Sequence, residues 1–292
     1  MTFKAVSSPF LVPFDGSFSI SHTSTRPPAE AGDKSQNKDV LEARVDELSE
    51  LQRVLYAHDR YSVLLIFQAL DAAGKDSTIR KVLTGVNPAG FQVFSFKAPS
   101  AEELDHDFLW RTARRLPERG RIGVFNRSYY EEVLVVRVHP EFIRGQKLPD
   151  PPGDMQAFWN DRYASIVDHE AHLARAGTVV LKFWLNVSKD EQKARFLSRL
   201  DEPEKNWKFS VGDVKERGHW DEYMQAYDQM LKATSRPWAP WYAIPADDKP
   251  FMRRTVADLI VQNLQSLDMD YPQVDPKEKE RFDEMRMILD QE

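Results

Sequence analysis

The sequence predicts an α/β fold in which helices cover a parallel sheet of five strands. Short apolar runs alternate with longer amphipathic segments along the chain, which is the pattern of strand–helix–strand units. The run Ser62–Phe67 is too short for a core helix, but it is long enough for a strand buried on both faces. Parallel strands of this kind are joined by right-handed crossovers and bind ligands at their carboxyl ends. We therefore expect a binding site where Ser62–Phe67 ends.

The other elements follow in order along the chain. Residues 1–36 are rich in Pro, Ser and Thr, and we expect an extended arm that is mobile or wraps a neighbouring chain. From Asp39, apolar residues recur at helical spacing, which predicts an amphipathic helix. Further strands are expected at Phe91–Phe96, Arg121–Phe125, Thr178–Leu185 and Tyr242–Ile244, and helices at Ser100–Arg115, Asp154–Ala174, Ser188–Leu200 and Asp248–Leu264.

Three segments of the chain lack a regular period. Residues 201–220 contain Pro and Gly, so we expect a mobile connection there, with another helix after it. A loop is expected at 149–153, and a polar tail with some helical character over 271–292.

Composition narrows the class of protein. With 292 residues, of which 41% are hydrophobic, the chain can bury one large core. The net charge of −6 argues against nucleic acid as the main partner. No apolar stretch is long enough to span a membrane and no signal peptide is visible, so we expect no membrane association and a cytoplasmic location. The absence of Cys excludes disulfides and thiolate metal sites.

The turn after Ser62–Phe67 has the features of a phosphate-binding loop. Gly74 permits a tight turn at the start of a helix, whose N-terminus attracts anions, and Lys75 adds a positive charge. The match to the usual pattern is imperfect, because Ala69 replaces the first Gly and Asp76 replaces Ser or Thr. An ordinary turn with a surface lysine is the alternative. Asp71 favours a site in which a divalent cation or a phosphoryl group lies between it and Lys75.

A second polar cluster follows the third expected strand. In phosphoryl-transfer proteins a carboxylate often holds the metal at such a strand end, and here Asn126 takes that place. Arg127 offers a bidentate fork for phosphate, and Glu131 and Glu132 supply negative charge. The alternative is a polar strand end that caps a helix.

A third cluster is basic. Arg195 and Arg199 share one face of a helix, where like charges repel unless an anion lies between them. The connection that follows adds Lys205 and Lys208, with aromatic residues between the charges. A basic mobile segment can close over phosphates and exclude water. The alternative is a solvated helix face, because acidic residues nearly balance the charge.

Taken together, these residues resemble the family-2 polyphosphate kinases from about Leu48 to Leu267. Several motifs in the same order carry the resemblance, which makes it far more specific than the loop alone. They are DAAGKD at 71–76, NPAG at 87–90, FKAPSAEEL at 96–104, FNRSYYE at 125–131 and NWKFSVGD at 206–213.

The resemblance implies a thymidylate-kinase-like P-loop kinase, a three-layer α/β sandwich with a helical lid. Residues 37–270 would form the phosphotransferase domain, with the lid at about 188–222. The implied reaction is Mg²⁺-dependent phosphate transfer between inorganic polyphosphate and AMP or ADP, giving ADP or ATP. By position, the resemblance makes Asp71, Lys75, Asn126 and Arg127 catalytic, Gly74, Arg195, Arg199 and Lys208 ligands of phosphate or polyphosphate, and Asp71 and Glu131 candidate metal ligands.

One departure and two alternatives remain open. Asn126 stands where the family commonly has Asp, which resembles the subgroup acting on both AMP and ADP; guanine nucleotides are further candidate acceptors. An ATP-dependent nucleotide kinase on the same core is one alternative, and a polyanion-binding scaffold with a vestigial loop is another. We also expect a homo-oligomer, either a dimer or a tetramer.

Overall fold

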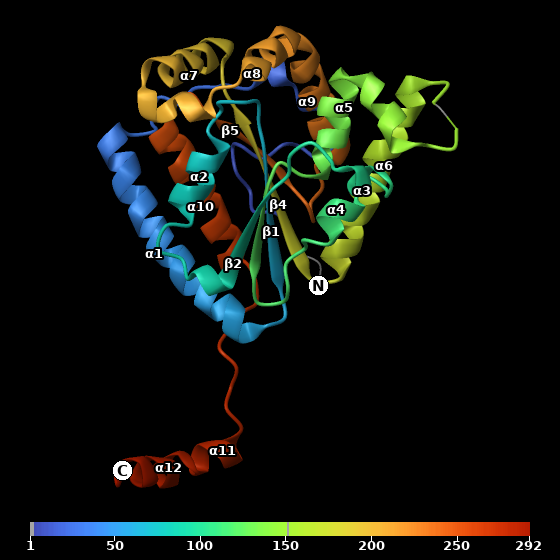
Figure 1. Ribbon diagram of the computed structural model, residues 1–292. Coiled ribbons are helices and arrows are strands. Elements are labelled where there is room, and N and C mark those ends of the chain that lie inside the picture. The colour runs from blue at the N-terminus through green and yellow to red at the C-terminus, as the bar shows by residue number, and fades with distance from the viewer. Residues whose placement is uncertain (1–2, 151) are drawn as a thin grey trace.

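Five parallel strands form one sheet in the order β2-β3-β1-β4-β5 (Figure 1). We describe a computed structural model of the chain, which covers residues 3–150 and 152–292. Residues 1–2 of the predicted arm and Pro151 of the predicted loop lie outside the described residues. The predicted parallel sheet of five strands is confirmed, and its strands are β1 (Ser62–Gln68), β2 (Phe91–Ser95), β3 (Ile122–Asn126), β4 (Thr178–Asn186) and β5 (Trp241–Pro245).

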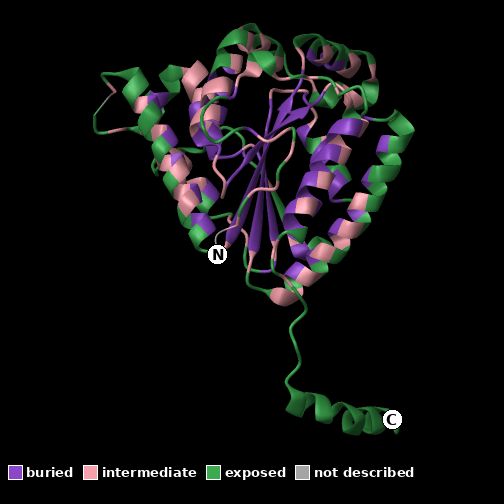
Figure 2. Cartoon of the chain, turned by 180° about the vertical axis from the view of Figure 1, so that it is seen from behind, coloured by how far each residue is buried: buried purple, intermediate pink, exposed green. Residues whose placement is uncertain are grey.

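Helices cover both faces of the sheet, so the fold has three layers. Alternate residues of β1 point to opposite faces. Leu65 belongs to the core beneath α1, α2 and α10, whereas Leu64 belongs to the core beneath α6 and α9. Every residue of β1 is buried, as expected for the central strand (Figure 2). The helices that cover these two faces are α1 (Lys34–His58), α2 (Lys75–Val82), α6 (Met155–Arg175), α9 (Trp220–Thr234) and α10 (Lys249–Gln265).

The predicted helix Ser100–Arg115 is wrong, because two short helices replace it. The capping box at its start is present, with Ser100 N donating to Glu103 Oε2 at 2.8 Å. The helix then ends, and the Asp107 side chain accepts a hydrogen bond from Leu109 N at 2.9 Å. Such a local side-chain bond competes with helix formation. The two helices are α3 (Ala101–Leu104) and α4 (Trp110–Ala113).

The connection after α7 (Lys189–Asp201), which the sequence predicts to be a mobile segment without a regular period over 201–220, contains short helical elements. It consists of a 3-10 turn, the short helix α8 (Val211–Glu216) and a second 3-10 turn. The hydroxyl of Ser210 caps α8 by accepting from Gly212 N at 3.1 Å. Elements this short contain too few turns to show a period in the sequence.

The N-terminal arm is extended, as predicted, but it packs on its own chain. Val12 N donates to the carbonyl of Trp241 at 2.9 Å, and Ala243 N donates to the carbonyl of Phe10 at 2.8 Å. The arm therefore lies along β5 and covers that edge of the sheet. It also ends earlier than predicted, because Asp33 caps α1 through a capping box with Gln36.

The C-terminal tail stands away from the sheet and its helices (Figure 1). It carries two short exposed helices, α11 (Pro276–Glu280) and α12 (Phe282–Leu289). Within residues 3–150 and 152–292, no helix is both long enough and apolar enough to cross a lipid bilayer.

Candidate active site

The carboxyl ends of β1, β2 and β3 lie level with one another. Phe67 of β1 and Ser95 of β2 both pair with Asn126, the last residue of β3. The predicted phosphate-binding loop leaves β1 at this edge and leads into α2. Parallel register therefore brings the loop and the Asn126–Arg127 segment together, as the sequence predicts.

The loop after β1 has a strained backbone. Ala72 has a φ of 61° and Gly74 a φ of 111°, both in the left-handed region. A Cβ at Gly74 would also lie 3.2 Å from Cε of Met252, so this position favours glycine. Non-glycine residues at positive φ are costly and occur mainly where the surrounding structure fixes them. This loop is fixed from inside by Lys75.

Lys75 is buried beneath the loop that precedes it. Its Nζ donates to the carbonyl of Ala69 at 2.6 Å and to that of Leu70 at 3.3 Å. Burial and, after it, the positive charge of Arg127 lower the pKa of Lys75 to about 8, although nearby carboxylates oppose the shift. The lysine is thus a cation whose charge a bound anion would stabilise.

Arg127 joins the loop to the segment that follows β3. Its Nη2 donates to Asp71 Oδ1 at 2.5 Å, and its Nη1 donates to Glu131 Oε2 at 2.9 Å. The backbone of Arg127 has a φ of 64°, and its N–H donates to the carbonyl of Phe67 at 3.0 Å. The charges of Glu131 and Asp71 raise the pKa of Arg127, although burial opposes them. The predicted residues Asp71, Arg127 and Glu131 therefore form one connected group.

Asn126 contacts the other side of the loop. Its Nδ2 donates to Asp76 Oδ1 at 2.5 Å. The neutral amide at the strand end is thus paired with a carboxylate on α2, and both side chains line the same groove as Lys75.

This groove is basic and open. It has a volume of about 660 Å³ and runs over the loop, the end of β2, α7 and the start of α10. Asp71 and Asp76 are its acidic residues. Its cationic residues are Lys75, Lys97, Arg127, Arg195, Arg199, Lys205, Lys208, Lys249 and Arg253.

Arg195 lines this groove, but all of its N–H donors are bonded to protein acceptors. Nε donates to Glu191 Oε1 at 2.7 Å. Nη1 donates to the carbonyls of Ala73 and Ala72 in the loop, at 2.6 and 3.2 Å. Nη2 donates to the carbonyls of Ala246 and Asp247, at 2.6 and 3.3 Å. These bonds support the loop, and direct binding of polyphosphate by Arg195 stays a prediction.

Arg199 and Lys208 lie on the lid wall of the groove. Arg199 Nη1 donates to Asp213 Oδ2 and to the carbonyl of Lys208, each at 3.2 Å. The ammonium of Lys208 lies 5.0 Å from the ring centre of Trp207. Burial raises the pKa of Asp213, and the nearby charge of Asp71 acts in the same direction. Both predicted lid cations therefore face the groove.

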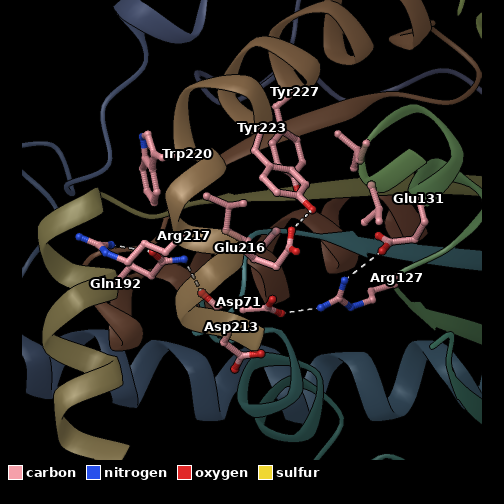
Figure 3. A pocket seen from close by; sticks show the side chains of 14 residues that line it. Asp71, Arg127, Glu131, Gln192, Asp213, Glu216, Arg217, Trp220, Tyr223 and Tyr227 are labelled. Carbon is pink, nitrogen blue, oxygen red and sulfur yellow. Dashed lines mark hydrogen bonds and ion pairs between the residues drawn. The ribbon is translucent and has the colours of Figure 1, made fainter. Parts of the chain in front are cut away.

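A second, narrower cavity lies on the other side of the Asp71–Arg127 pair (Figure 3). It has a volume of about 30 Å³, which suffices for a water molecule or two. Its walls combine aromatic rings with acidic and amide side chains. The lining residues from the lid side are Gln192, Asp213, Glu216, Arg217, Trp220, Tyr223 and Tyr227.

The lid is held over this cavity by Glu216 at the end of α8. Glu216 Oε2 accepts a hydrogen bond from the Tyr223 hydroxyl at 2.7 Å and lies 3.0 Å from His139 Nε2. His139 follows α5 (Val135–Val138), on the opposite side of the cavity from α7. Hydrogen bonds from Tyr223 and His139 lower the pKa of Glu216, although burial opposes them. We call this contact the lid latch.

A buried ion pair fixes the segment that carries Arg127. Lys182 Nζ donates to Glu170 Oε2 at 2.5 Å and to the Tyr130 hydroxyl at 2.9 Å. The hydroxyls of Tyr129 and Tyr130 each donate to Glu170 Oε1 at 2.8 Å. Because Tyr129 and Tyr130 follow closely after Arg127, this network anchors the backbone from which Arg127 projects.

Sequence reasoning missed several of these residues. The lid latch and the aromatic wall come from helices without a recognisable motif. Lys249 and Arg253 are four positions apart at the start of α10. This spacing places both cations on one helix face and could have identified them as a candidate anion-binding pair.

The chain has close relatives among known proteins. The model of the family Polyphosphate kinase 2 (PPK2) matches residues 31–273. An ADP-polyphosphate phosphotransferase of Rhodopseudomonas palustris is 56% identical, covering 88% of this chain and 89% of the relative. An AMP/ADP-polyphosphate phosphotransferase of Meiothermus ruber is 44% identical, covering 83% and 86%.

The fold agrees with these sequence relations. The crystal structure of Polyphosphate Kinase 2 from Arthrobacter aurescens TC1 superposes with a TM-score of 0.85 at 39% identity, covering 94% of each chain. The family model extends over most of the chain, and the identities extend over nearly the whole length of the relatives. The chain therefore belongs to the polyphosphate kinase 2 family.

Proposed function

We propose that this protein transfers phosphate between inorganic polyphosphate and adenine nucleotides, forming ADP from AMP and ATP from ADP. One observation carries the proposal: the Asp71–Arg127 pair borders both the basic groove and the aromatic cavity. The groove suits a long polyanion, and the cavity offers rings for a nucleobase. The names of the two relatives above, one acting with ADP and the other with AMP and ADP, support the same pair of substrates.

The reaction then takes place at the boundary between groove and cavity. An oxygen of the nucleotide's terminal phosphate attacks the end phosphorus of polyphosphate, and the bond to the next phosphate of the chain breaks. Phosphoryl transfer depends on in-line positioning and on neutralisation of charge. Lys75 and Arg127 supply that charge. Because the attacking oxygen is already anionic, no strong base is required.

The carboxylates at the groove fit a magnesium ion that is shared with the substrate. Among the described residues, no three His, Cys, Asp or Glu side chains are grouped so as to hold a metal by themselves. Mg²⁺ is commonly held by one or two carboxylates together with substrate phosphates. Asp71 and Asp76 face the groove and would provide such ligands, with Glu131 as a further candidate. A bound Mg²⁺ would supply additional neutralisation of phosphate charge.

The lid has to move for a nucleotide to enter. A cavity of about 30 Å³ is far smaller than the several hundred Å³ that nucleotide-sized ligands occupy. The lid at about 188–222 forms much of its wall, so outward movement of α8 would enlarge it. Closure of the lid would then exclude water as a competing acceptor.

A direct assay tests the proposal. The protein is incubated with Mg²⁺ and polyphosphate, AMP, ADP, GMP and GDP are offered in turn, and product nucleotides are followed over time. We expect ADP and ATP to form, and we expect Asp71→Asn to lower the rate by at least a hundredfold, on the order seen when a charge-stabilising group is removed. Asp161→Asn, on the exposed surface of α6, is the matched control. Absence of ADP and ATP as products would contradict the proposed function, and full activity in the folded Asp71→Asn protein would contradict the role of Asp71.

An ATP-dependent nucleotide kinase is the alternative on the same fold. The groove holds more cations than one triphosphate requires, which favours polyphosphate as the donor. Rapid ADP formation from ATP and AMP, with no transfer from polyphosphate, would favour the alternative.

A further inference from the structure

Two cations at the start of α10 line the basic groove beyond the loop. We propose that Lys249 and Arg253 form a distal subsite, which binds phosphates of the polyphosphate chain remote from the transferred group. The subsite makes the enzyme favour long chains over short ones. This inference rests on the proposed function and adds to it the path of the donor.

The first observation is that these two cations have no partner. Three other cations of the groove are paired with carboxylates, Arg127 with Asp71, Arg199 with Asp213 and Lys205 with Glu202, whereas Lys97 and Lys208 share the unpaired state of Lys249 and Arg253 among the described residues. Among the described residues, the side chains of Lys249 and Arg253 have neither a hydrogen bond nor an ion pair. The Nε of Arg253 is moreover buried without an acceptor. Buried donors without acceptors are rare and call for an explanation, and a bound ion is one such explanation.

The second observation is that like charges crowd around this pair. Burial lowers the pKa of Lys249, and the charges of Arg195 and Arg253 lower it further. The pKa of Arg253 is lowered by burial and then by the charges of Arg80 and Arg195. Such crowding destabilises the protein unless an anion lies among the charges.

The carboxylates of this region do not neutralise the pair. Glu191 raises the pKa of Lys249, but its Oε1 accepts from Arg195 at 2.7 Å. Asp248 precedes Lys249 and caps α10 by accepting from Phe251 N at 2.8 Å. Glu202 also lies near Lys249, but its Oε2 pairs with Lys205 and its Oε1 accepts from the Ser198 hydroxyl at 2.5 Å. All three carboxylates are therefore bonded elsewhere, and the positive charge of Lys249 and Arg253 remains at the groove.

The distribution of positive charge indicates the path of the polyphosphate chain through the groove. From the loop, the groove extends toward the end of β2 and also between α7 and α10. Lys97 is the cation of the β2 branch. The branch between the helices holds Arg199, Lys205, Lys208, Lys249 and Arg253, and Arg80 on α2 lies close to Arg253. We therefore place the distal phosphates between α7 and α10.

Donors of different length test this subsite. Transfer to ADP is measured with tripolyphosphate and with long-chain polyphosphate, using the wild type and the double variant Lys249→Ala/Arg253→Ala. We expect the KM for the long chain to rise about tenfold more than the KM for tripolyphosphate, on the scale of two lost solvent-screened ion pairs. The affinity for long-chain polyphosphate without nucleotide is measured separately and should fall by a similar factor.

Matched controls separate this effect from a general loss of charge. Lys34→Ala/Lys38→Ala removes two exposed cations at the same spacing on α1, outside the groove, and should leave both KM values unchanged. Lys97→Ala tests the competing branch. If the α10 variant does not fold, as judged by its melting temperature, Lys249→Gln/Arg253→Gln replaces it.

Two outcomes would overturn the inference. One is an equal KM change for both donors in the α10 variant, including no change. The other is a long-chain defect in Lys97→Ala alone. A wild type that binds long-chain polyphosphate but transfers nothing from it would instead refute the proposed function, while the binding measurement would still test the subsite.

Discussion

Asn126 donates a hydrogen bond from Nδ2 to Asp76 Oδ1 at 2.5 Å. Both residues stand at positions where the sequence departs from an expected pattern, one at the strand end and one after the loop lysine. Through this bond the neutral amide of Asn126 satisfies an oxygen of the Asp76 carboxylate on α2. A second carboxylate at position 126 would lie directly against the first.

Asn126→Asp should therefore make the protein depend on metal for its stability. Two carboxylates in contact repel, so without metal the variant should lose on the order of 1–3 kcal/mol of unfolding free energy. A divalent cation bound between them should restore much of this loss. Thermal melts in EDTA and in Mg²⁺ measure both effects, with Asn160→Asp on the exposed surface of α6 as the control. Equal melting temperatures with and without metal would contradict the prediction.

Binding of polyphosphate should take up a proton near pH 8. The buried Lys75 has a pKa of about 8 in the free protein, so about half of the molecules lack this proton at pH 8. A bound polyanion favours the charged form and raises that pKa. Affinity should accordingly fall as the pH rises from about 7 to about 9.

Calorimetry in buffers of different ionisation enthalpy measures this uptake. We expect about half a proton at pH 8 and almost none near pH 6. Lys75→Arg should abolish the uptake, because arginine stays charged throughout this range. The same uptake in wild type and Lys75→Arg would assign the proton to another group.

The buried pair of Lys182 and Glu170 should be essential for folding. Lys182→Met leaves the carboxylate of Glu170 buried without its cation, which should cost about 3–5 kcal/mol of unfolding free energy. The double variant Lys182→Met/Glu170→Leu removes both charges and should recover part of the loss. Urea unfolding followed by circular dichroism gives these values. A single variant as stable as the wild type would show that the pair contributes little.

Glu216→Gln should loosen the lid latch. The charged acceptor of Tyr223 and the partner of His139 is then lost, so α8 should open more often. Hydrogen exchange over residues 211–219 should become on the order of tenfold faster, the effect of losing one charge-assisted bond. Glu42→Gln, at an exposed position of α1, serves as the control. Unchanged exchange in the Glu216 variant would show that other contacts hold the lid.

The sequence was sufficient for those parts of the fold that local patterns determine. The apolar run of β1 and the loop after it are contiguous in the chain, and parallel register brings the distant Asn126–Arg127 segment beside them. The interruption of the predicted helix between α3 and α4 could not be predicted from the sequence pattern. It coincides with a local hydrogen bond in which the Asp107 side chain accepts from Leu109 N.

The two arginines on α7 show a second limit of prediction from sequence. Arg195 and Arg199 have the spacing of neighbours on one helix face, yet Arg195 bonds to the carbonyls of the loop while Arg199 pairs with Asp213. Which of them is turned inward depends on the depth at which α7 packs against the loop. That depth is set by contacts between segments that are distant in the sequence, so it cannot be predicted from residue spacing along one helix.

The arm along β5 has a consequence for how copies of this protein associate. An uncovered edge strand invites pairing with another chain, and Phe10 and Val12 occupy that edge through their backbone groups. Strand addition between molecules is thereby blocked at β5, which leaves β2 as the other border of the sheet. Removal of the first dozen or so residues would expose the unpaired backbone N–H and C=O groups of β5 and make the protein prone to aggregate edge to edge.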